Sequence, residues 1–162
     1  MLIVLDTTYI LPIFNIEIDV FRKKDLKVLL NSKIEKLVSP HILIEAKWVL
    51  YSLIKRGVIR DFNRAVNDFN DGLQIIREKN VFKLAEYLDP EVDLIESKIF
   101  RTIGLRDYFD RIILATAKVY DAVLLTEDNE LLKLSVVKYP ELLPMNIMNW
   151  GEFKKEYLSQ ET

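Results

Sequence analysis

The sequence predicts an α/β fold, a three-layer α/β/α sandwich with a mostly parallel central sheet. Short apolar runs alternate along the chain with longer segments of helical periodicity, which is typical of parallel strands joined by crossover helices. The first run, residues 2–5, is apolar at every position, as expected of a strand buried on both faces of a parallel sheet. No internal repeat or linker interrupts this pattern, so residues 1–162 are expected to form one domain.

Four elements are predicted in the first third of the chain. Apolar residues recur at helical spacing in "DLKVLLNSKIEKL", and the strand-like "LVSP" closes at Pro40. The helical segment "HILIEAKWVLYSLIKRG" ends at Gly57, and glycine is favoured just past a helix C-terminus. The predicted elements are a strand over 1–5, a helix over 25–37, a strand over 37–40 and a helix over 41–57.

The middle of the chain, residues 58–103, is predicted to be mainly helical. "IRDFNRAVNDFNDGL" and "VFKLAEYL" have helical patterns, "LQIIRE" fits a strand or a helix, and Asp89-Pro90 ends one helix and starts the next. The last third predicts a helix over 107–120, a strand in "AVLLTED", a short helix in "NELLKLS", a strand in "MNIMN" and a closing helix in "WGEFKKEYL".

Composition excludes several classes of function. The 23 basic and 25 acidic residues give a net charge of −2, so binding to nucleic acid would need a local basic patch. No cysteine is present and His41 is the one histidine, which excludes disulfides, thiol nucleophiles, Cys-ligated zinc and His-rich metal sites. No segment approaches the ~20 apolar residues of a membrane span. The N-terminal apolar run has no basic leader, so we expect a cytoplasmic location and no membrane contact.

Four acids fall at the ends of the predicted core elements. Asp6 and Asp128 directly follow strands, Glu45 lies about one turn into a helix, and Asp110 lies in the first turn of the helix that precedes the "AVLL" strand. Ligands collect at the carboxyl ends of parallel strands, so these acids are expected to meet at one rim of the sheet. Clustered carboxylates raise one another's pKa, and a hard cation such as Mg²⁺ or Mn²⁺ relieves that repulsion. Such an ion suits phosphodiester hydrolysis.

Each acid also has a purely structural interpretation. Asp6 can start a turn, although Thr7 and Thr8 add more oxygen atoms there than a turn requires. Glu45 can be an exposed helix residue. Asp110 can complement the helix dipole, with Asp107 as the N-cap of the same helix, and Asp128 can cap the helix that follows it. Their joint placement, more than any single acid, favours a metal site.

Three segments resemble the PIN-domain nucleases, a family that includes the VapC-type toxins of toxin–antitoxin modules. "IVLDTTYIL" resembles the family's first strand, "VSPHILIEAKWVL" the segment with its glutamate, and "DRIILATAKVYDAVLLTEDNEL" its most specific stretch. The resemblance implies metal-dependent cleavage of RNA with Mg²⁺ or Mn²⁺, a homodimer and an antitoxin partner. Carried over to this chain, it implies Asp6, Glu45, Asp110 and Asp128 as the catalytic, metal-binding acids, with Thr7, Thr126 and Asp107 in support.

Other polar and aromatic residues near these segments also have expected roles. Arg106 and Arg111 flank Asp110 and are candidates for contact with an RNA backbone, although Arg111 can instead pair with an acid. His41 is expected to be a surface or capping residue. Trp48, Trp150 and the tyrosines are expected to serve packing or dimer contacts before base stacking.

Three alternatives to an active toxin-like ribonuclease stay open on the sequence. One is a catalytically inactive PIN-like scaffold that binds protein or RNA. The second is a nuclease of RNA maturation. The third is a phospho-acceptor signalling domain, which also begins with a strand leading to an Asp. A phospho-acceptor domain would carry further acids after its first strand and a Lys at the end of its last core strand, and "DTT" and "TED" match this poorly.

Overall fold

A five-stranded sheet, with every neighbouring pair parallel, forms the centre of the computed structural model, which describes residues 1–78 and 80–158. The strand order is β3-β2-β1-β4-β5. The strands are β1 (Leu2–Leu5), β2 (Glu35–Val38), β3 (Phe82–Leu84), β4 (Val123–Leu125) and β5 (Ile147–Met148). The predicted parallel sheet is confirmed.

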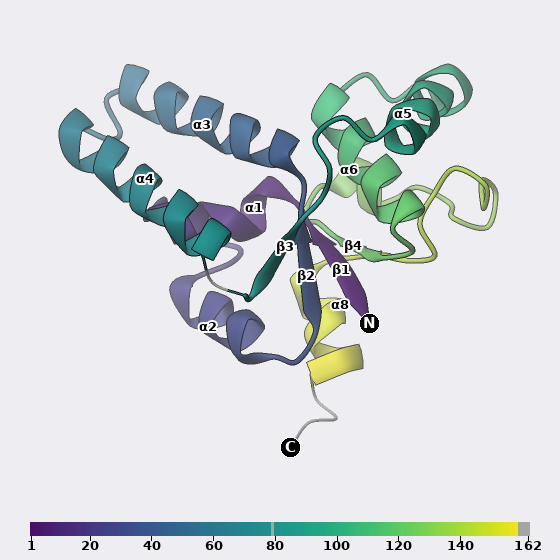
Figure 1. The fold of residues 1–162 in the computed structure, drawn as a ribbon, viewed down its shortest axis with the longest axis horizontal. Helices are drawn as coiled ribbons and strands as arrows, with labels where there is room; N and C mark the ends of the chain where they lie inside the picture. Colours follow the sequence, from purple (N-terminus) through teal and green to yellow (C-terminus); the bar gives the residue numbers. More distant parts are fainter. Residues whose placement is uncertain (79, 159–162) are drawn as a thin grey trace.

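Helices flank the sheet, with α3 and α4 on one side of the strands in Figure 1 and α5 and α6 on the other. The longer helices are α2 (Lys23–Asn31), α3 (Pro40–Lys55), α4 (Phe62–Glu78), α5 (Pro90–Ile103) and α6 (Tyr108–Val119). The short ones are α1 (Thr7–Ile10), the 3-10 helix η1 (Leu11–Phe14), α7 (Asn129–Leu132), α8 (Trp150–Phe153) and the π-helix η2 (Lys154–Leu158). None of these helices is both long and apolar enough to cross a membrane, over the residues that the structure describes.

The ends of the helices follow the local signals. The Ser39 hydroxyl accepts a hydrogen bond from the His41 amide at the start of α3 (3.3 Å), and Gly57, just past its end, has a φ of 72° that suits glycine. Asp89 caps α5 by accepting from the amides of Glu91 and Val92. The predicted boundaries at these positions are confirmed.

Two predicted helices are wrong in part because strand pairing overrides their periodicity. The helix predicted over 25–37 ends at Asn31, and Glu35–Val38 pairs as β2 between β1 and β3. The segment "VFKLAEYL" contains the edge strand β3, whose Phe82 side chain is buried, in place of a helix. "LQIIRE" continues α4.

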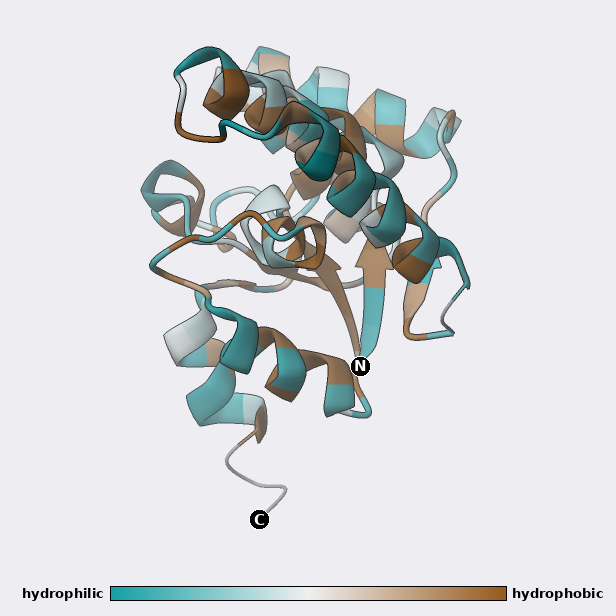
Figure 2. Ribbon diagram, turned by 90° about the vertical axis from the view of Figure 1, so that its left-hand side faces the viewer, coloured by the Kyte–Doolittle hydropathy of each residue, from teal (hydrophilic) through white to brown (hydrophobic). Residues whose placement is uncertain are grey.

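The core lies between the sheet and the helices that cover it. Ile3, Val4 and Leu5 of β1 are completely buried, as predicted for a strand with both faces covered. The α6 helix packs on β1 and β4 and buries an unbroken run over 112–117. In Figure 2 the helices carry hydrophobic stretches on one side and hydrophilic ones on the other. This packing fixes the start of α6 above the ends of β1 and β4.

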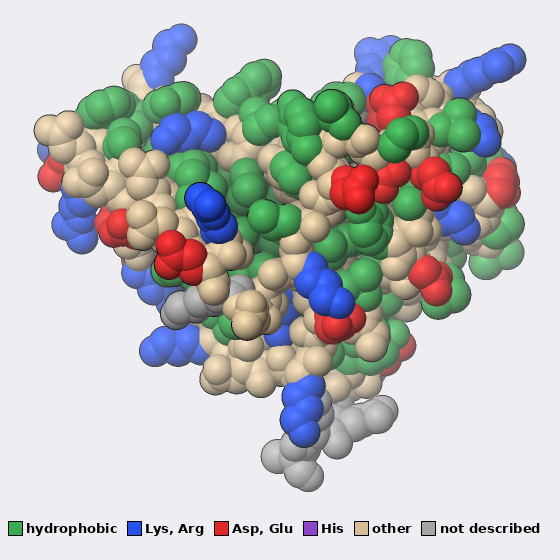
Figure 3. Space-filling view, viewed as in Figure 1, with side chains coloured by type: hydrophobic (Ala, Val, Ile, Leu, Met, Phe, Trp, Pro, Cys, Tyr) green, Lys and Arg blue, Asp and Glu red, His purple; other side chains and the backbone are tan. Residues whose placement is uncertain are grey.

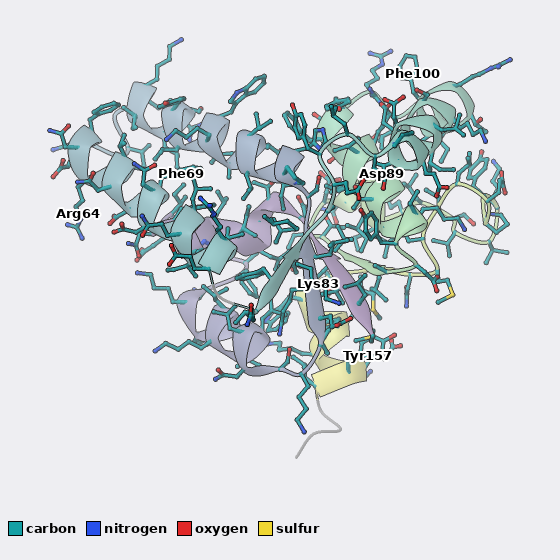
Figure 4. The ribbon with its side chains drawn as sticks, viewed as in Figure 1. Arg64, Phe69, Lys83, Asp89, Phe100 and Tyr157 are labelled. Atoms are coloured by element: carbon teal, nitrogen blue, oxygen red, sulfur yellow. The ribbon has the colours of Figure 1, made fainter. Side chains whose placement is uncertain are left out.

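The contact between α4 and η1 depends on Gly72. A Cβ atom at this position would lie 2.8 Å from Cε1 of Phe14, 3.0 Å from the carbonyl oxygen of Ile13, and nearer still to Cδ1 of Phe14. The Phe14 ring is itself stacked on Phe69 at 4.2 Å between centroids. Phe69 extends from α4 toward α3 in Figure 4. Neither ring can move without loss of this packing.

We therefore expect Gly72→Ala to destabilise the protein, although alanine is the better helix former by ~1 kcal/mol. Overpacking typically costs ~1–3 kcal/mol, so the net loss should be ~1 kcal/mol, or a melting temperature lower by ~2–4 °C. Thermal unfolding measures this. Asn70→Ala, at an exposed position of the same helix, is the control and should not lower the melting temperature. An unchanged melting temperature in Gly72→Ala would contradict the close α4–η1 contact.

Candidate active site

The ends of β1 and β4 bring Asp6 and the 126–128 segment together. Leu5 and Leu125 are register partners, and the Asp6 amide donates to the Leu125 carbonyl (3.0 Å). The buried Thr126 hydroxyl donates to Oδ2 of Asp6 (2.6 Å) and accepts from the amide of Asp128 (3.0 Å). One hydroxyl therefore holds the Asp6 carboxylate and positions the backbone of Asp128.

Thr7 connects Asp6 to the α3 helix. Its amide donates to Oδ1 of Asp6 (2.5 Å), which makes Asp6 the N-cap of α1. Its buried hydroxyl donates to Oε2 of Glu45. The two threonines expected in supporting positions thus make direct hydrogen bonds to the candidate acids.

The remaining candidate acids lie at helix starts. Asp107 is the N-cap of α6 and accepts from the amides of Phe109 (2.8 Å) and Asp110 (3.3 Å), as predicted. Asp110 is the third residue of that helix and half-buried. Asp128 caps α7, accepting from the amides of Glu130 (2.6 Å) and Leu131 (3.2 Å). The capping roles are real, and they leave one oxygen of each capping carboxylate free of these bonds.

The pKa shifts show that these acids share one electrostatic field. Loss of hydration raises the pKa of Asp110 to about 7, and repulsion from Asp107, Asp128, Asp6 and Glu45 adds to the rise. No cation is among the causes. Four segments distant in sequence therefore place their carboxylates close enough to repel one another.

Asp6 and Glu45 are shifted in the same direction. Burial raises the pKa of Asp6 to about 6, with repulsion from Asp128 and Glu127, against the hydrogen bonds from Thr126 and Thr7 that lower it. Burial also raises the pKa of Glu45, and the Thr7 hydrogen bond opposes this rise. At a pH of about 6 to 7, Asp6 and Asp110 are therefore each present in both protonated and ionised forms.

The donor set suits a hard divalent cation in its chemistry. Carboxylate oxygens are preferred ligands of Mg²⁺ and Mn²⁺, and a cation would relieve the repulsion that raises these pKa values. Over residues 1–78 and 80–158, however, no three Asp, Glu or His side chains form a ready-made group that holds a metal ion. Mg²⁺ usually binds through one or two carboxylates and keeps several waters. The rim fits such an ion, provided that its side chains rotate toward it.

Arg111 does not point into this rim. Its Nε pairs with Oε1 of Glu96 at 2.5 Å, and its Nη1 donates to the carbonyls of Leu105 (3.0 Å) and Arg106 (2.5 Å). The Arg111 side chain is only 11% exposed. The structure thus shows the alternative role, pairing with an acid, and Arg111 ties the segment before α6 to α5. Arg106 is exposed and stays the candidate for RNA contact.

Glu127 is a residue of this rim that the sequence interpretation missed. It accepts from the Tyr9 hydroxyl (2.7 Å) and the Trp150 amide (3.0 Å), so it joins the end of β4 to α1 and α8. Its only signal in the sequence is its place between Thr126 and Asp128. No pattern in the sequence indicated that Glu96 pairs with Arg111.

The two tryptophans differ in their exposure to solvent, which the sequence did not predict. Trp150 is 4% exposed and donates from Nε1 to Asp25 (2.8 Å), as expected of a packing residue. Trp48 is 64% exposed and meets only the edge of the Phe109 ring, at 5.7 Å between centroids. Core packing is therefore the wrong interpretation for Trp48, which stands on the surface three residues after Glu45.

The chain matches a known protein family. A family model described as "PIN domain" matches residues 3–137. A search of curated protein sequences finds no significant match.

Solved structures with the same fold include three with low sequence identity. PAE2754 from Pyrobaculum aerophilum has a TM-score of 0.63 at 18% identity, covering 99% of this chain and 100% of its own. VapBC2 from Rickettsia felis, bound to a DNA fragment from its promoter, has 0.57 at 15%, covering 93% and 99%. VapC20 from Mycobacterium tuberculosis, a sarcin–ricin loop cleaving toxin, has 0.52 at 16%, covering 80% and 92%.

The repulsion around Asp110 has a measurable consequence. In the metal-free protein its pKa is about 7 against about 3.8 when unfolded, so the folded state binds the proton more tightly. The contribution of Asp110 to stability is therefore greatest below pH ~4, falls as the pH rises, and is fully lost above pH ~7. Asp110→Asn removes this penalty. Because Asp110 is half-exposed, solvent screening reduces the gain to ~1 kcal/mol, or a melting temperature ~2–4 °C higher at pH 8.

Thermal unfolding with a chelator at pH 4 and pH 8 measures the effect. The difference between Asp110→Asn and wild type should vanish at pH 4. Asp71→Asn, the same chemical change at an exposed position in the middle of α4, should show no difference at either pH. A variant Asp110→Asn that is less stable than wild type at pH 8 would mean that Asp110 is not crowded by other acids.

Proposed function

The chain belongs to the PIN domain family, and from this premise we propose that it is a metal-dependent endoribonuclease that hydrolyses RNA phosphodiester bonds. The family model covers residues 3–137, and the family is one of nucleases. The observation that carries the proposal is the shared field of Asp6, Glu45, Asp110 and Asp128 at the carboxyl edge of the sheet. A nuclease that uses a divalent metal ion requires such a cluster of carboxylates, with no protein cation already bound to it.

We assign the metal-binding role to these four acids, with Mg²⁺ or Mn²⁺ as the ion. When bound, the ion supplies activation of a water molecule and neutralises charge on the phosphoryl group. Thr126 and Thr7 orient the two oxygens of Asp6, and Thr7 also holds Glu45. Such fixed orientation of ligands is what supporting hydrogen bonds provide at metal sites.

Other residues of the rim would handle protons and substrate. In the metal-free protein the pKa of Asp110 is raised to about 7, so we expect its carboxyl group to give up a proton when the ion binds, because ligating carboxylates are ionised. Asp107 adds a further acid at the start of α6. Exposed Arg106, next to it, is proposed to contact the RNA backbone. No cysteine or second histidine is needed for this chemistry.

The biological role we propose is that of a toxin restrained by an antitoxin, acting in the cytoplasm as a homodimer. The descriptions of VapBC2 and VapC20 support the toxin role by analogy of fold. A phospho-acceptor domain is disfavoured, because such domains have the strand order 2-1-3-4-5 and this sheet has the order β3-β2-β1-β4-β5.

Cleavage of a labelled, unstructured RNA in the presence of Mn²⁺ tests the proposal. Wild type is expected to cut internally, and a chelator should stop the reaction. Asp6→Asn should lower the rate by more than the ~10–100-fold that loss of an outer hydrogen-bond partner typically costs at a metal site. Asp121→Asn should match wild type.

Three outcomes of this assay are informative. Cleavage that persists in the chelator would contradict the metal requirement. Equal activity in Asp6→Asn would remove Asp6 from the site. No cleavage by wild type, together with retained RNA binding, would favour an inactive scaffold.

A further inference from the structure

A hollow of about 250 Å³ is lined by residues from the starts of α3, α5 and α6 and from the segment before α5. Three rings line it: His41 in the first turn of α3, Tyr108 at the start of α6, and Tyr87 in the segment before α5. Asp89, the N-cap of α5, and Asp93, in the first turn of α5, also line the hollow. Figure 4 shows Asp89 beside α6, and in Figure 3 acidic and hydrophobic side chains stand next to one another over α5.

The rings of the hollow are held against one another. His41 and Tyr87 stack with centroids 5.0 Å apart and planes 12° apart, and His41 meets the edge of Tyr108 at 6.0 Å. Nδ1 of His41 lies 3.2 Å from the Ser39 hydroxyl. Tyr87 and Tyr108 are still 54% and 44% exposed. The hollow therefore offers preformed aromatic faces with room beside them.

The hollow and the acid rim are carried in part by the same two helices. His41 and Glu45 are four residues apart on α3 and so lie on the same side of the helix. Tyr108 and Asp110 share the first turn of α6. The same two helix starts therefore carry both the rings and two of the proposed metal-binding acids. One strand of substrate can therefore place one group in the hollow and a neighbouring group at the acids.

The size and charge of the hollow restrict its occupant. About 250 Å³ is below the ~300–1,000 Å³ of pockets for drug-sized ligands, so it suits one flat ring system. Within the described part of the chain, the residues that line it include no Lys or Arg, so it would repel a phosphate. The Asp93 carboxylate makes no hydrogen bond to any other described residue, and Asp89 uses only Oδ1 for its cap. Both can accept from an amino group.

We propose that this hollow binds one unpaired base of the RNA substrate, next to the phosphate that is cut, and that it selects a base with an exocyclic amino group. Tyr108 stacks on the base, the mutually stacked rings of Tyr87 and His41 border it, and Asp93 accepts a hydrogen bond from its amino group. The inference rests on the proposed nuclease function. It also explains how an acidic chain holds RNA, since base–aromatic stacking does not depend on neutralising phosphates.

A second copy of the chain is the main competing occupant. A two-fold contact centred on this face would bring each acid rim against the same rim of the other copy. Juxtaposed like charges oppose such an interface. An RNA base carries no charge, and its phosphate is the group that the rim is proposed to receive with a metal ion. The charges around the hollow therefore favour the base.

Kinetics with a short, unstructured RNA whose cut site has been mapped tests the stacking. Loss of one stacking ring costs ~1–3 kcal/mol, so Tyr108→Ala should raise KM by about 5- to 150-fold with little change in kcat. Tyr108→Phe keeps the ring and should restore KM. Phe62→Ala removes an exposed ring from α4, away from the hollow, and should leave KM unchanged. Salt should raise KM to the same extent in wild type and in Tyr108→Ala, because salt weakens the phosphate contacts and not the stacking.

Base selection is tested by changing the bases next to the cut one at a time. Adenine replaced by purine, which lacks only the amino group, should raise KM by about tenfold at one position and at no other. In Asp93→Asn this difference should shrink, because a carboxylate is the stronger acceptor. Asp121→Asn is the matched control. An amino-group effect that is equal in wild type and Asp93→Asn would overturn the assignment of Asp93.

The outcomes separate this inference from the proposed function. Absence of any metal-dependent cleavage by wild type would contradict the nuclease proposal itself. A set of RNAs, each with 2-aminopurine at a different position, still tests the hollow in that case: each RNA is bound to Asp6→Asn, and fluorescence that stays unchanged at every position would overturn the base site. Cleavage with a normal KM in Tyr108→Ala would overturn the base site alone. Conversion of a dimer to a monomer by Tyr108→Ala in sedimentation, with RNA binding intact, would assign the hollow to a second copy.

Discussion

Repulsion among carboxylates at the carboxyl edge of the sheet is the constraint on which the rest of this structure depends. Parallel pairing of β1 with β4 places Asp6 beside the 126–128 segment, and the packing of α6 on both strands places Asp110 above them. Neutral donors hold the two most buried acids: the Thr126 hydroxyl and the Thr7 amide donate to Asp6, and the Thr7 hydroxyl donates to Glu45. These hydrogen bonds orient the acids without neutralising them, which is consistent with the proposed metal site.

The arrangement of cations around this rim supports the same conclusion. Arg111 follows Asp110 in the sequence, yet its guanidinium turns to Glu96 and to two carbonyls of the preceding segment. Lys47, two residues after Glu45, lies over the Phe69 ring at 4.3 Å. Arg111 and Lys47 thus make their contacts away from the four candidate acids, so these two side chains do not neutralise the charge of the site.

The parts of this structure that the sequence predicted are those set by local signals. Asp6 and Asp128 follow continuous apolar strands, and Asp107 carries the capping pattern of a helix start, so their positions could be inferred from a few neighbouring residues. The edge strand β3 could not, because the pattern around Phe82 is helical and only pairing with β2 makes it a strand. The partners Glu96 and Glu127, and the exposure of Trp48, likewise depend on segments that meet only in the folded chain.

Titration calorimetry with Mn²⁺ is the most direct test of the crowded rim. At pH 6.5, in two buffers of different ionisation enthalpy, it measures both binding and the protons released. Asp6 and Asp110 have pKa values of about 6 and about 7, so binding should be saturable and should release on the order of one proton per ion, since ligating acids must be ionised. Asp6→Asn should abolish or greatly weaken it. Saturable binding without proton release, or equal binding by Asp6→Asn, would contradict the account.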